Sequence, residues 1–186
     1  MIKDRILGNH SKELNKFQTY ILYFFLFAFI GWCLETAYCI IVLGHFTKRG
    51  FLFGPICPIY GYGALILIIF LEKYKSRKIK LFTYSAIIFS VLEYIASYIL
   101  ETIFHAFWWD YRTDAFNLNG RIAAFYSLAW GFIAIIFIDY LYPFLKKNFD
   151  RLLSKVPYSF SEILIYLFIG IYFIDTAISC LNYSIR

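Results

Sequence analysis

The chain has 186 residues, of which 61% are hydrophobic and 23% aromatic, and it carries a formal charge of +6 with a mean hydropathy of +0.65. A soluble domain of this size has no use for so much apolar surface, so the composition indicates that the solvent is a lipid bilayer. The basic residues fall between apolar segments rather than along one face, which excludes a nucleic-acid-binding patch.

Residues 1–16 are polar and basic, and we expect them to form a cytoplasmic tail within a single membrane domain that occupies 1–186. Five apolar stretches follow, each of roughly 20 residues or more, which is the length that a helix needs to cross the hydrocarbon. The sequence therefore predicts an all-α polytopic membrane bundle of about five transmembrane helices. The first stretch is too long for the core of a signal peptide, so we expect no cleavage. The predicted spans are 17–43, 51–71, 81–107, 122–145 and 160–181.

The second stretch opens with glycines and prolines, from Gly54 through Pro58 to Gly63. Proline lacks a backbone N–H and suits the first turn of a helix rather than its middle. A helix from Pro58 to Leu71 rises only about 20 Å, whereas the hydrocarbon core is about 30 Å thick. We therefore predict that residues 48–57 form a re-entrant segment, which dips in from outside and leads into a half-helix. The free N–H groups of that half-helix would point into the membrane.

Lysine and arginine residues predict the orientation, because cytoplasmic connectors carry an excess of them. The N-terminal tail and the connectors after the second and fourth stretches hold thirteen, whereas the opposite side holds five. We therefore expect a cytoplasmic N-terminus and an external C-terminus. Trp108 and Trp109 then lie at the outer interface, where indole rings are favoured.

Acidic residues lie inside the apolar stretches, where a carboxylate at the centre of a helix in lipid costs about 3 kcal/mol. Such residues usually face a bundle interior or a wet cavity. Counted from the inner boundary at 1.5 Å per residue, Glu35, Glu93 and Asp175 lie at roughly 18–22 Å, the level of Pro58. Steps of four residues extend a polar stripe from Glu93 through Glu101 toward the outer surface.

This arrangement has two interpretations. One is a polar pocket that opens outward, with Arg49 and Arg121 at its mouth. The other is that the carboxylates are paired struts that hold the bundle together. We favour the pocket, because several carboxylates share one depth beside a proline-broken helix. The candidate substrate-binding residues are Glu35, Arg49, Pro58, Glu93, Glu101, Arg121 and Asp175.

No catalytic residue, cofactor or metal site is predicted. The chain has no phosphate-binding Gly-x-x-x-x-Gly-Lys loop, no Gly-x-Ser-x-Gly and no His-Glu-x-x-His motif. His45 and His105 could both reach the outer face near Glu101, but a metal site needs three or four ligands in fixed geometry, which sequence alone does not show, so none is predicted. The outer connector 108–121 mixes aromatic residues, charges and an Asn-Gly turn signal. It either covers the pocket or forms an interface loop held by its own ion pairs.

Several motifs lie along most of the chain. They are Gly31-Trp32-Cys33-Leu34-Glu35, the run KRGFLFGPICPIYGYG at 48–63, Leu92-Glu93-Tyr94, Trp108–Asp110 and Asn119-Gly120-Arg121-Ile122. Together they resemble the small bacterial membrane proteins known as ABC-transporter type IV, or CmpB-type, permeases. The resemblance extends over about residues 24–143 and implies a polytopic plasma-membrane protein with a transport role. If ATP drives the transport, a separate ATPase subunit supplies it.

Three functional hypotheses remain open. The first is a transport permease, acting as a homo-oligomer or with partner subunits, whose carboxylates favour a cationic or proton-coupled substrate. The helix start at Pro58 favours an anionic group, so a zwitterion satisfies both. The second is a membrane enzyme acting on a lipid or lipid-linked substrate, with Glu35 or Glu93 as acid and base. The third is a non-catalytic scaffold in which the carboxylates are struts.

Overall fold

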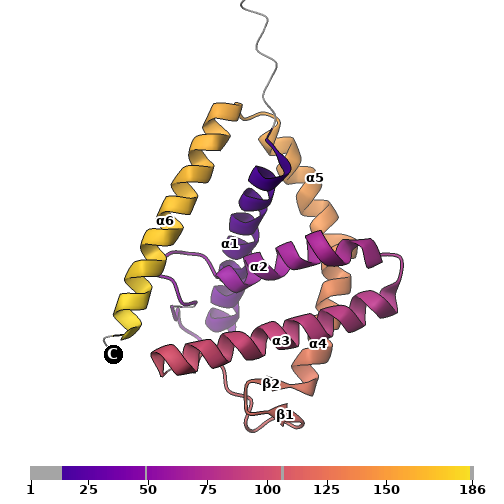
Figure 1. The fold of residues 1–186 in the computed structure, drawn as a ribbon, viewed down its shortest axis with the longest axis vertical. Coiled ribbons are helices and arrows are strands. Elements are labelled where there is room, and N and C mark those ends of the chain that lie inside the picture. The colour runs from indigo at the N-terminus through magenta and orange to yellow at the C-terminus, as the bar shows by residue number, and fades with distance from the viewer. Residues whose placement is uncertain (1–13, 49, 106, 185–186) are drawn as a thin grey trace, which may run out of the picture. The chain divides into compact units, whose positions relative to one another are not determined.

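The computed structural model describes residues 14–48, 50–105 and 107–184. Four helices in these residues are long and apolar enough to cross a membrane, and they confirm the predicted all-α membrane fold (Figure 1). Most of the predicted basic tail, and Arg49, lie outside the described residues. The four helices are α1 (Lys16–Leu43), α3 (Lys78–Phe104), the run Ala124–Leu153 and α6 (Tyr158–Ser184).

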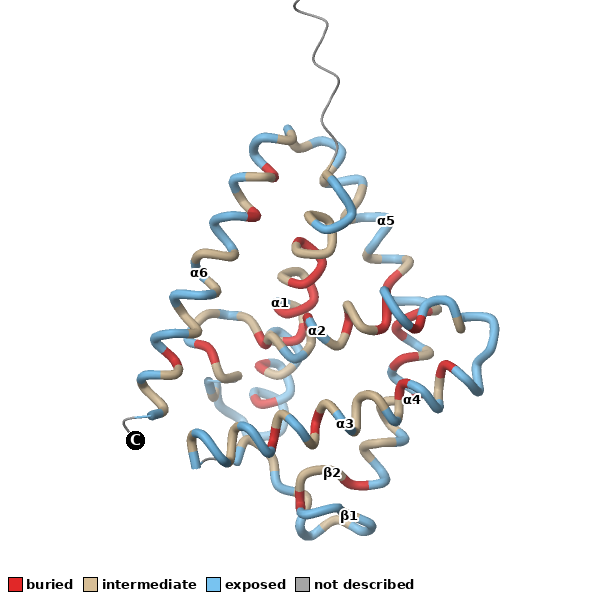
Figure 2. Tube along the Cα trace, viewed as in Figure 1, coloured by how far each residue is buried: buried red, intermediate tan, exposed pale blue. Residues whose placement is uncertain are grey.

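Helix α1 has well-defined signals at both ends. Asn15 accepts a hydrogen bond from the backbone N–H of Gln18, and the Gln18 side chain accepts one from the Asn15 N–H, which is a capping box. Gly44 ends the helix in the left-handed conformation, with φ of 73°. The helix therefore begins and ends within one residue of the predicted span, and its buried residues recur along its length (Figure 2).

The second apolar stretch contains α2 (Pro58–Ile66), which starts at the predicted proline. A π-helical turn, η2 (Leu67–Leu71), and a 3₁₀ turn, η3 (Glu72–Tyr74), continue the helical run. Residues 51–57 hold no helix. Among the described residues this stretch is not one of the four long apolar helices, and the passage of 51–57 into the bilayer stays a prediction.

Helix α3 ends three residues before the predicted boundary of its span. His105 caps it in the left-handed conformation, with φ of 51°, and its N–H donates to the Glu101 carbonyl. The chain then forms a short hairpin of β1 (Asn117–Leu118) and β2 (Ile122–Ala123), which leads directly into the next helix. The turn of the hairpin contains Asn119 and Gly120, with φ of 54° and 68°, as the Asn-Gly signal predicted.

The next helix consists of α4 (Ala124–Ile136), a π-helical turn η4 (Phe137–Leu141) and α5 (Tyr142–Leu153). Pro143 has no N–H to donate to the preceding turn, and the wide π turn directly before it accommodates the missing bond. The helix runs eight residues past the predicted end at Leu145. Polar residues therefore continue the helix beyond the apolar span, which hydropathy alone does not reveal.

The chain divides into two compact units, Met1–Tyr62 with Asn148–Ala177, and Gly63–Lys147 with Ile178–Arg186. In the second unit α3 and α4 pack side by side. Ser90 donates to Ser127 at 2.7 Å, and a Cβ on Gly131 would lie 2.6 Å from the Phe82 ring. Small residues thus let the two helices approach closely. At the far end of the pair, Lys78 forms a salt bridge with Asp139.

In the first unit, a glycine on α1 and a glycine on α2 allow the two helices to pack closely. A Cβ on Gly31 would lie 2.3 Å from Cγ of Tyr60 and 2.5 Å from its Cβ. A Cβ on Gly61 would lie 2.7 Å from the carbonyl oxygen of Phe24. The backbones of α1 and α2 are therefore in direct contact where α2 begins.

Replacing Gly31 by alanine is expected to push the start of α2 away from α1. The added methyl meets the base of the Tyr60 side chain rather than a flexible end, and overpacking of this kind costs about 1–3 kcal/mol. Thermal unfolding of the purified protein in detergent will show a lower melting temperature. Gly170→Ala is the matched control, because nothing lies within 4 Å of a Cβ there. Equal melting temperatures for the two variants would contradict this close approach.

Candidate functional site

Asp175 of α6 holds the non-helical stretch that precedes α2. Its two carboxylate oxygens accept hydrogen bonds from the backbone N–H groups of Phe53, at 2.9 Å, and Gly54, at 2.7 Å. These two bonds tie the backbone at 53–54 directly to α6. The predicted intramembrane acid is therefore bound to the predicted re-entrant segment.

Glu35 of α1 accepts a hydrogen bond from the hydroxyl of Tyr60, in the first turn of α2. The N–H of Cys57 donates to the carbonyl oxygen of Ala28 at 2.9 Å. Ala28 lies about two helical turns before Glu35 on α1. We call Glu35, Phe53, Gly54, Tyr60 and Asp175 the loop cluster. Three sequence-predicted residues, Glu35, Pro58 and Asp175, thus meet along one short segment.

The sequence predicted free N–H groups at the start of α2, able to attract an anion. Asp175 accepts the N–H groups of Phe53 and Gly54, which lie before α2, and the Tyr60 N–H donates to the Cys57 carbonyl at 3.1 Å. The protein itself thus supplies an acidic partner to the backbone before α2, and an anion site at the first turn of α2 stays a prediction.

Glu93 of α3 is buried, with 6% of its surface exposed. One carboxylate oxygen accepts a hydrogen bond from the Tyr111 hydroxyl at 2.9 Å, and the other accepts one from the Trp130 indole N–H at 3.1 Å. Tyr111 belongs to the outer connector and Trp130 to α4. Helix α4 and the connector therefore each supply one donor to Glu93.

Tyr111 is well suited to remain a hydrogen-bond donor. Burial, followed by the neighbouring Glu93 carboxylate, raises the pKa of Tyr111 far above its ordinary value. Its ring also stacks on Tyr126, with centroids 4.2 Å apart. The connector therefore folds back against α3 and presents a protonated phenol to an intramembrane carboxylate.

The second carboxylate of α3, Glu101, forms a salt bridge with Arg121 of the connector. The guanidinium carbon of Arg121 lies 5.5 Å from the ring centroids of both Tyr94 and Tyr98, within the range of cation–π attraction. Trp109 donates to the Arg121 carbonyl at 3.0 Å. Two candidate residues, Glu101 and Arg121, are therefore in direct contact.

The Asn-Gly turn brings Arg121 to this position. Asn119 donates through its side chain to the Tyr94 hydroxyl at 2.8 Å, and the N–H of Arg121 donates to the Leu118 carbonyl at 3.0 Å. A Cβ on Gly120 would lie 2.5 Å from Cγ of Arg112, so the positive φ and the space both require glycine.

The connector also has its own ion pair, as one of the two interpretations predicted. Arg112 donates to both carboxylate oxygens of Asp110, and these hydrogen bonds hold the pKa of Asp110 below its usual range. The bonds of Tyr111 and Arg121 to α3 show that the connector covers helix carboxylates as well. The structure contains elements of both interpretations.

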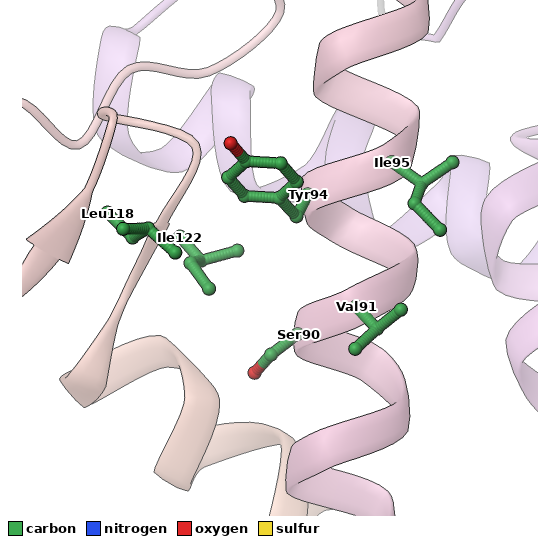
Figure 3. Close-up of a pocket in the computed structure, with 6 residues that line it drawn as sticks. All are labelled: Ser90, Val91, Tyr94, Ile95, Leu118 and Ile122. Atoms are coloured by element: carbon green, nitrogen blue, oxygen red, sulfur yellow. The ribbon is translucent and has the colours of Figure 1, made fainter.

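The candidate residues fall into the two units. Glu35, Pro58 and Asp175 lie in the first unit, and Glu93, Glu101 and Arg121 lie in the second. Each unit brings its own set together, and the common layer of all six stays a prediction. A hollow of about 190 Å³ lies on the second unit, between α3 and the hairpin (Figure 3). Its lining is Ser90, Val91, Tyr94, Ile95, Leu118 and Ile122, so it is apolar rather than the predicted polar pocket.

Sequence reasoning missed Tyr60, Tyr111 and Trp130, which donate hydrogen bonds to the carboxylates. It also missed Tyr94 and Tyr98, whose rings lie beside the Arg121 guanidinium. Tyrosine occurs 17 times in the chain, so no single tyrosine stands out. Only their position could have pointed to two of them, because Tyr94 and Tyr98 lie about two turns and one turn before the predicted polar residue Glu101 on α3. In the described residues no group of three or more His, Cys, Asp or Glu side chains could hold a metal ion.

The fold and these intramembrane polar contacts define a polytopic α-helical membrane protein. The chain belongs to the family described as "Putative ABC-transporter type IV", whose model matches residues 22–180. The family predicted from the sequence motifs is therefore confirmed, and the protein is a membrane protein of a transport-related family. Searches of curated proteins and of solved structures gave no match.

Replacing Asp175 by asparagine is expected to loosen residues 53–54. Hydrogen bonds to a charged acceptor contribute about 1.5–3 kcal/mol, so the amides of Phe53 and Gly54 should exchange with deuterium about tenfold faster or more. Hydrogen–deuterium exchange with mass spectrometry measures this. Glu162→Gln, on the same helix, is the control, since Glu162 bonds to Tyr158 instead. Unchanged exchange at 53–54 would show that Asp175 does not fix the loop.

Replacing Tyr111 by phenylalanine is expected to destabilise the second unit by about 1–3 kcal/mol, because Glu93 loses a donor in a buried place. The pKa of Tyr111 is raised by folding, so its contribution is complete below pH about 10, the ordinary pKa of tyrosine, and falls as the pH rises further. Unfolding in denaturant at pH 7 and pH 11 tests both statements. Tyr140→Phe, with 72% of Tyr140 exposed, should have little effect.

Proposed function

We propose that the protein is a transport permease of the plasma membrane, with a cytoplasmic N-terminus and an external C-terminus. The observation that supports this most is the double hydrogen bond from the 53–54 backbone to Asp175. Transporters place broken helices and irregular backbone at their binding level, where neighbouring helices satisfy the freed backbone groups. The family supports the same class of function.

The candidate residues have different parts in this proposal. Glu35 and Asp175 hold the segment before α2, and Pro58 sets where the helix begins. Glu93 and Glu101 act on the solute when the connector releases them, and Arg49 and Arg121 form the outer entrance. In the second unit, Glu93 and Glu101 thus exchange a donor of the protein for the solute.

The energy source and the assembly are part of the same proposal. A separate ATPase subunit, which the family supports, drives the transport if ATP is used, and the membrane subunit acts as a homo-oligomer or with further partner subunits. These partners belong to the proposal. Copurification of the protein with a cytoplasmic ATPase would support this assembly.

A scaffold is the second candidate, and one observation favours it. Glu35, Glu93, Glu101 and Asp175 each accept hydrogen bonds or a salt bridge from the protein, as struts would. A scaffold carries no solute and loses partner binding when its struts are removed. Replacing one of these acids by its uncharged amide therefore abolishes solute exchange in a permease and partner binding in a scaffold.

Replacing Glu93 by glutamine is expected to abolish solute exchange while the protein still folds, since glutamine preserves shape and removes the charge. Counterflow in proteoliposomes needs no energy source and uses labelled choline, glycine and acetate as a cation, a zwitterion and an anion. We expect choline or glycine to enter and acetate to stay out. Glu72→Gln, at an exposed position of η3, is the control. No exchange of any solute, together with lost partner copurification in the Glu93 variant, would establish the scaffold instead.

A further inference from the structure

Three side chains on one face of α3 form a setting that suits a positive charge. Tyr94, Tyr98 and Glu101 follow each other at intervals of four and three residues, so they lie above one another on the helix. We call them the cation cradle. Aromatic faces and a carboxylate are the groups with which proteins recognise organic cations.

The cradle is occupied in this structure by a residue from another element. Arg121 comes from the hairpin turn, and its guanidinium carbon lies 5.5 Å from both ring centroids while it pairs with Glu101. Only 15% of the Arg121 side chain is exposed. The connector thus supplies a tethered cation to a site built on α3.

Arg121 does not fit the cradle completely. Its Nε atom is buried and has no hydrogen-bond partner. A buried N–H without an acceptor lowers the stability of the arrangement that contains it. A free cation without this extra donor would avoid that loss.

An apolar hollow continues from the cradle. Tyr94 belongs to both, and Ile122, which follows Arg121, lines the hollow. Figure 3 shows Ser90 and Tyr94 of α3 pointing toward Leu118 and Ile122 across it. Its volume is about 190 Å³, and apolar cavities of about 150 Å³ hold one benzene-sized group. The hollow therefore suits a small apolar group attached to the cation.

We propose that Tyr94, Tyr98 and Glu101 bind an amphiphilic organic cation and that Arg121 is the resting occupant of this site. The ammonium or guanidinium head replaces the Arg121 guanidinium against both rings and Glu101. The apolar part enters the hollow between α3 and the hairpin. This proposal rests on the proposed transport function for its purpose and names the class of solute.

A fixed strut is the competing explanation. It accounts for the salt bridge between Glu101 and Arg121, and it predicts that removing Arg121 only weakens the connector. It does not account for the unpaired Nε atom or for the adjoining hollow. The two explanations differ in whether the vacated cradle accepts a free cation.

Isothermal titration of the full chain in nanodiscs with n-butylammonium tests the proposal, with n-butanol as the uncharged probe and empty nanodiscs subtracted. The wild type should bind the cation weakly, because Arg121 must leave first. Arg121→Ala should bind it at least about tenfold more tightly, and adding Glu101→Gln should abolish that gain. Arg121→Gln, which keeps the bulk of the side chain, serves if the alanine variant does not fold.

Arg112→Ala is the matched control in the same connector, because Arg112 pairs with Asp110 and 66% of its side chain is exposed. It should bind like the wild type. Three results would overturn the proposal: no binding by the wild type, equal binding by the wild type and both Arg121 variants, or butanol binding as tightly as butylammonium. Counterflow without cation binding rejects the cation site alone. Cation binding without any counterflow rejects the transport function alone.

Discussion

A carboxylate within a membrane-spanning helix needs hydrogen-bond donors from the protein. This constraint determines which segments pack against the long helices. Lipid offers no such donors, so each acid draws a neighbouring segment toward it. Asp175 accepts hydrogen bonds from the backbone before α2. Glu93 accepts one from Tyr111 of the connector 108–121, and Glu101 forms a salt bridge with Arg121 of the same connector. The non-helical segment before α2 and the folded connector 108–121 therefore both contact carboxylates of the long helices. The need of these carboxylates for hydrogen-bond donors accounts for both features.

The two units differ in the kind of hydrogen-bond donor that contacts their helix carboxylates. In the first unit backbone N–H groups serve Asp175, so the loop conformation and the charge depend on each other. In the second unit tyrosine, tryptophan and arginine side chains serve Glu93 and Glu101. Side-chain donors can turn away and leave the backbone in place, whereas backbone donors move only with the loop. The second unit is therefore the easier place to expose a carboxylate to a solute.

Hydropathy and proline chemistry predicted the helices well, because both act locally. Pro58 begins α2 since its missing N–H is harmless only there, and Asn119-Gly120 forms the turn that its permitted φ angles allow. Boundaries failed where polar residues stay helical, as in the run that extends to Leu153. The position of a carboxylate on a helix could be predicted, but its partner could not. Tyr111 meets Glu93 through a fold of the connector that no periodicity encodes.

The salt bridge between Lys78 and Asp139 has a mechanical consequence. It joins the first turn of α3 to η4, the turn that follows α4, and the hydrogen bond between Ser90 and Ser127 joins α3 to α4 directly. These polar contacts hold the helix pair at two points, both on the Lys78 side of Glu101. Separating α3 from its neighbour therefore breaks fewer polar contacts at the Glu101 end, provided that the Arg121 salt bridge has opened.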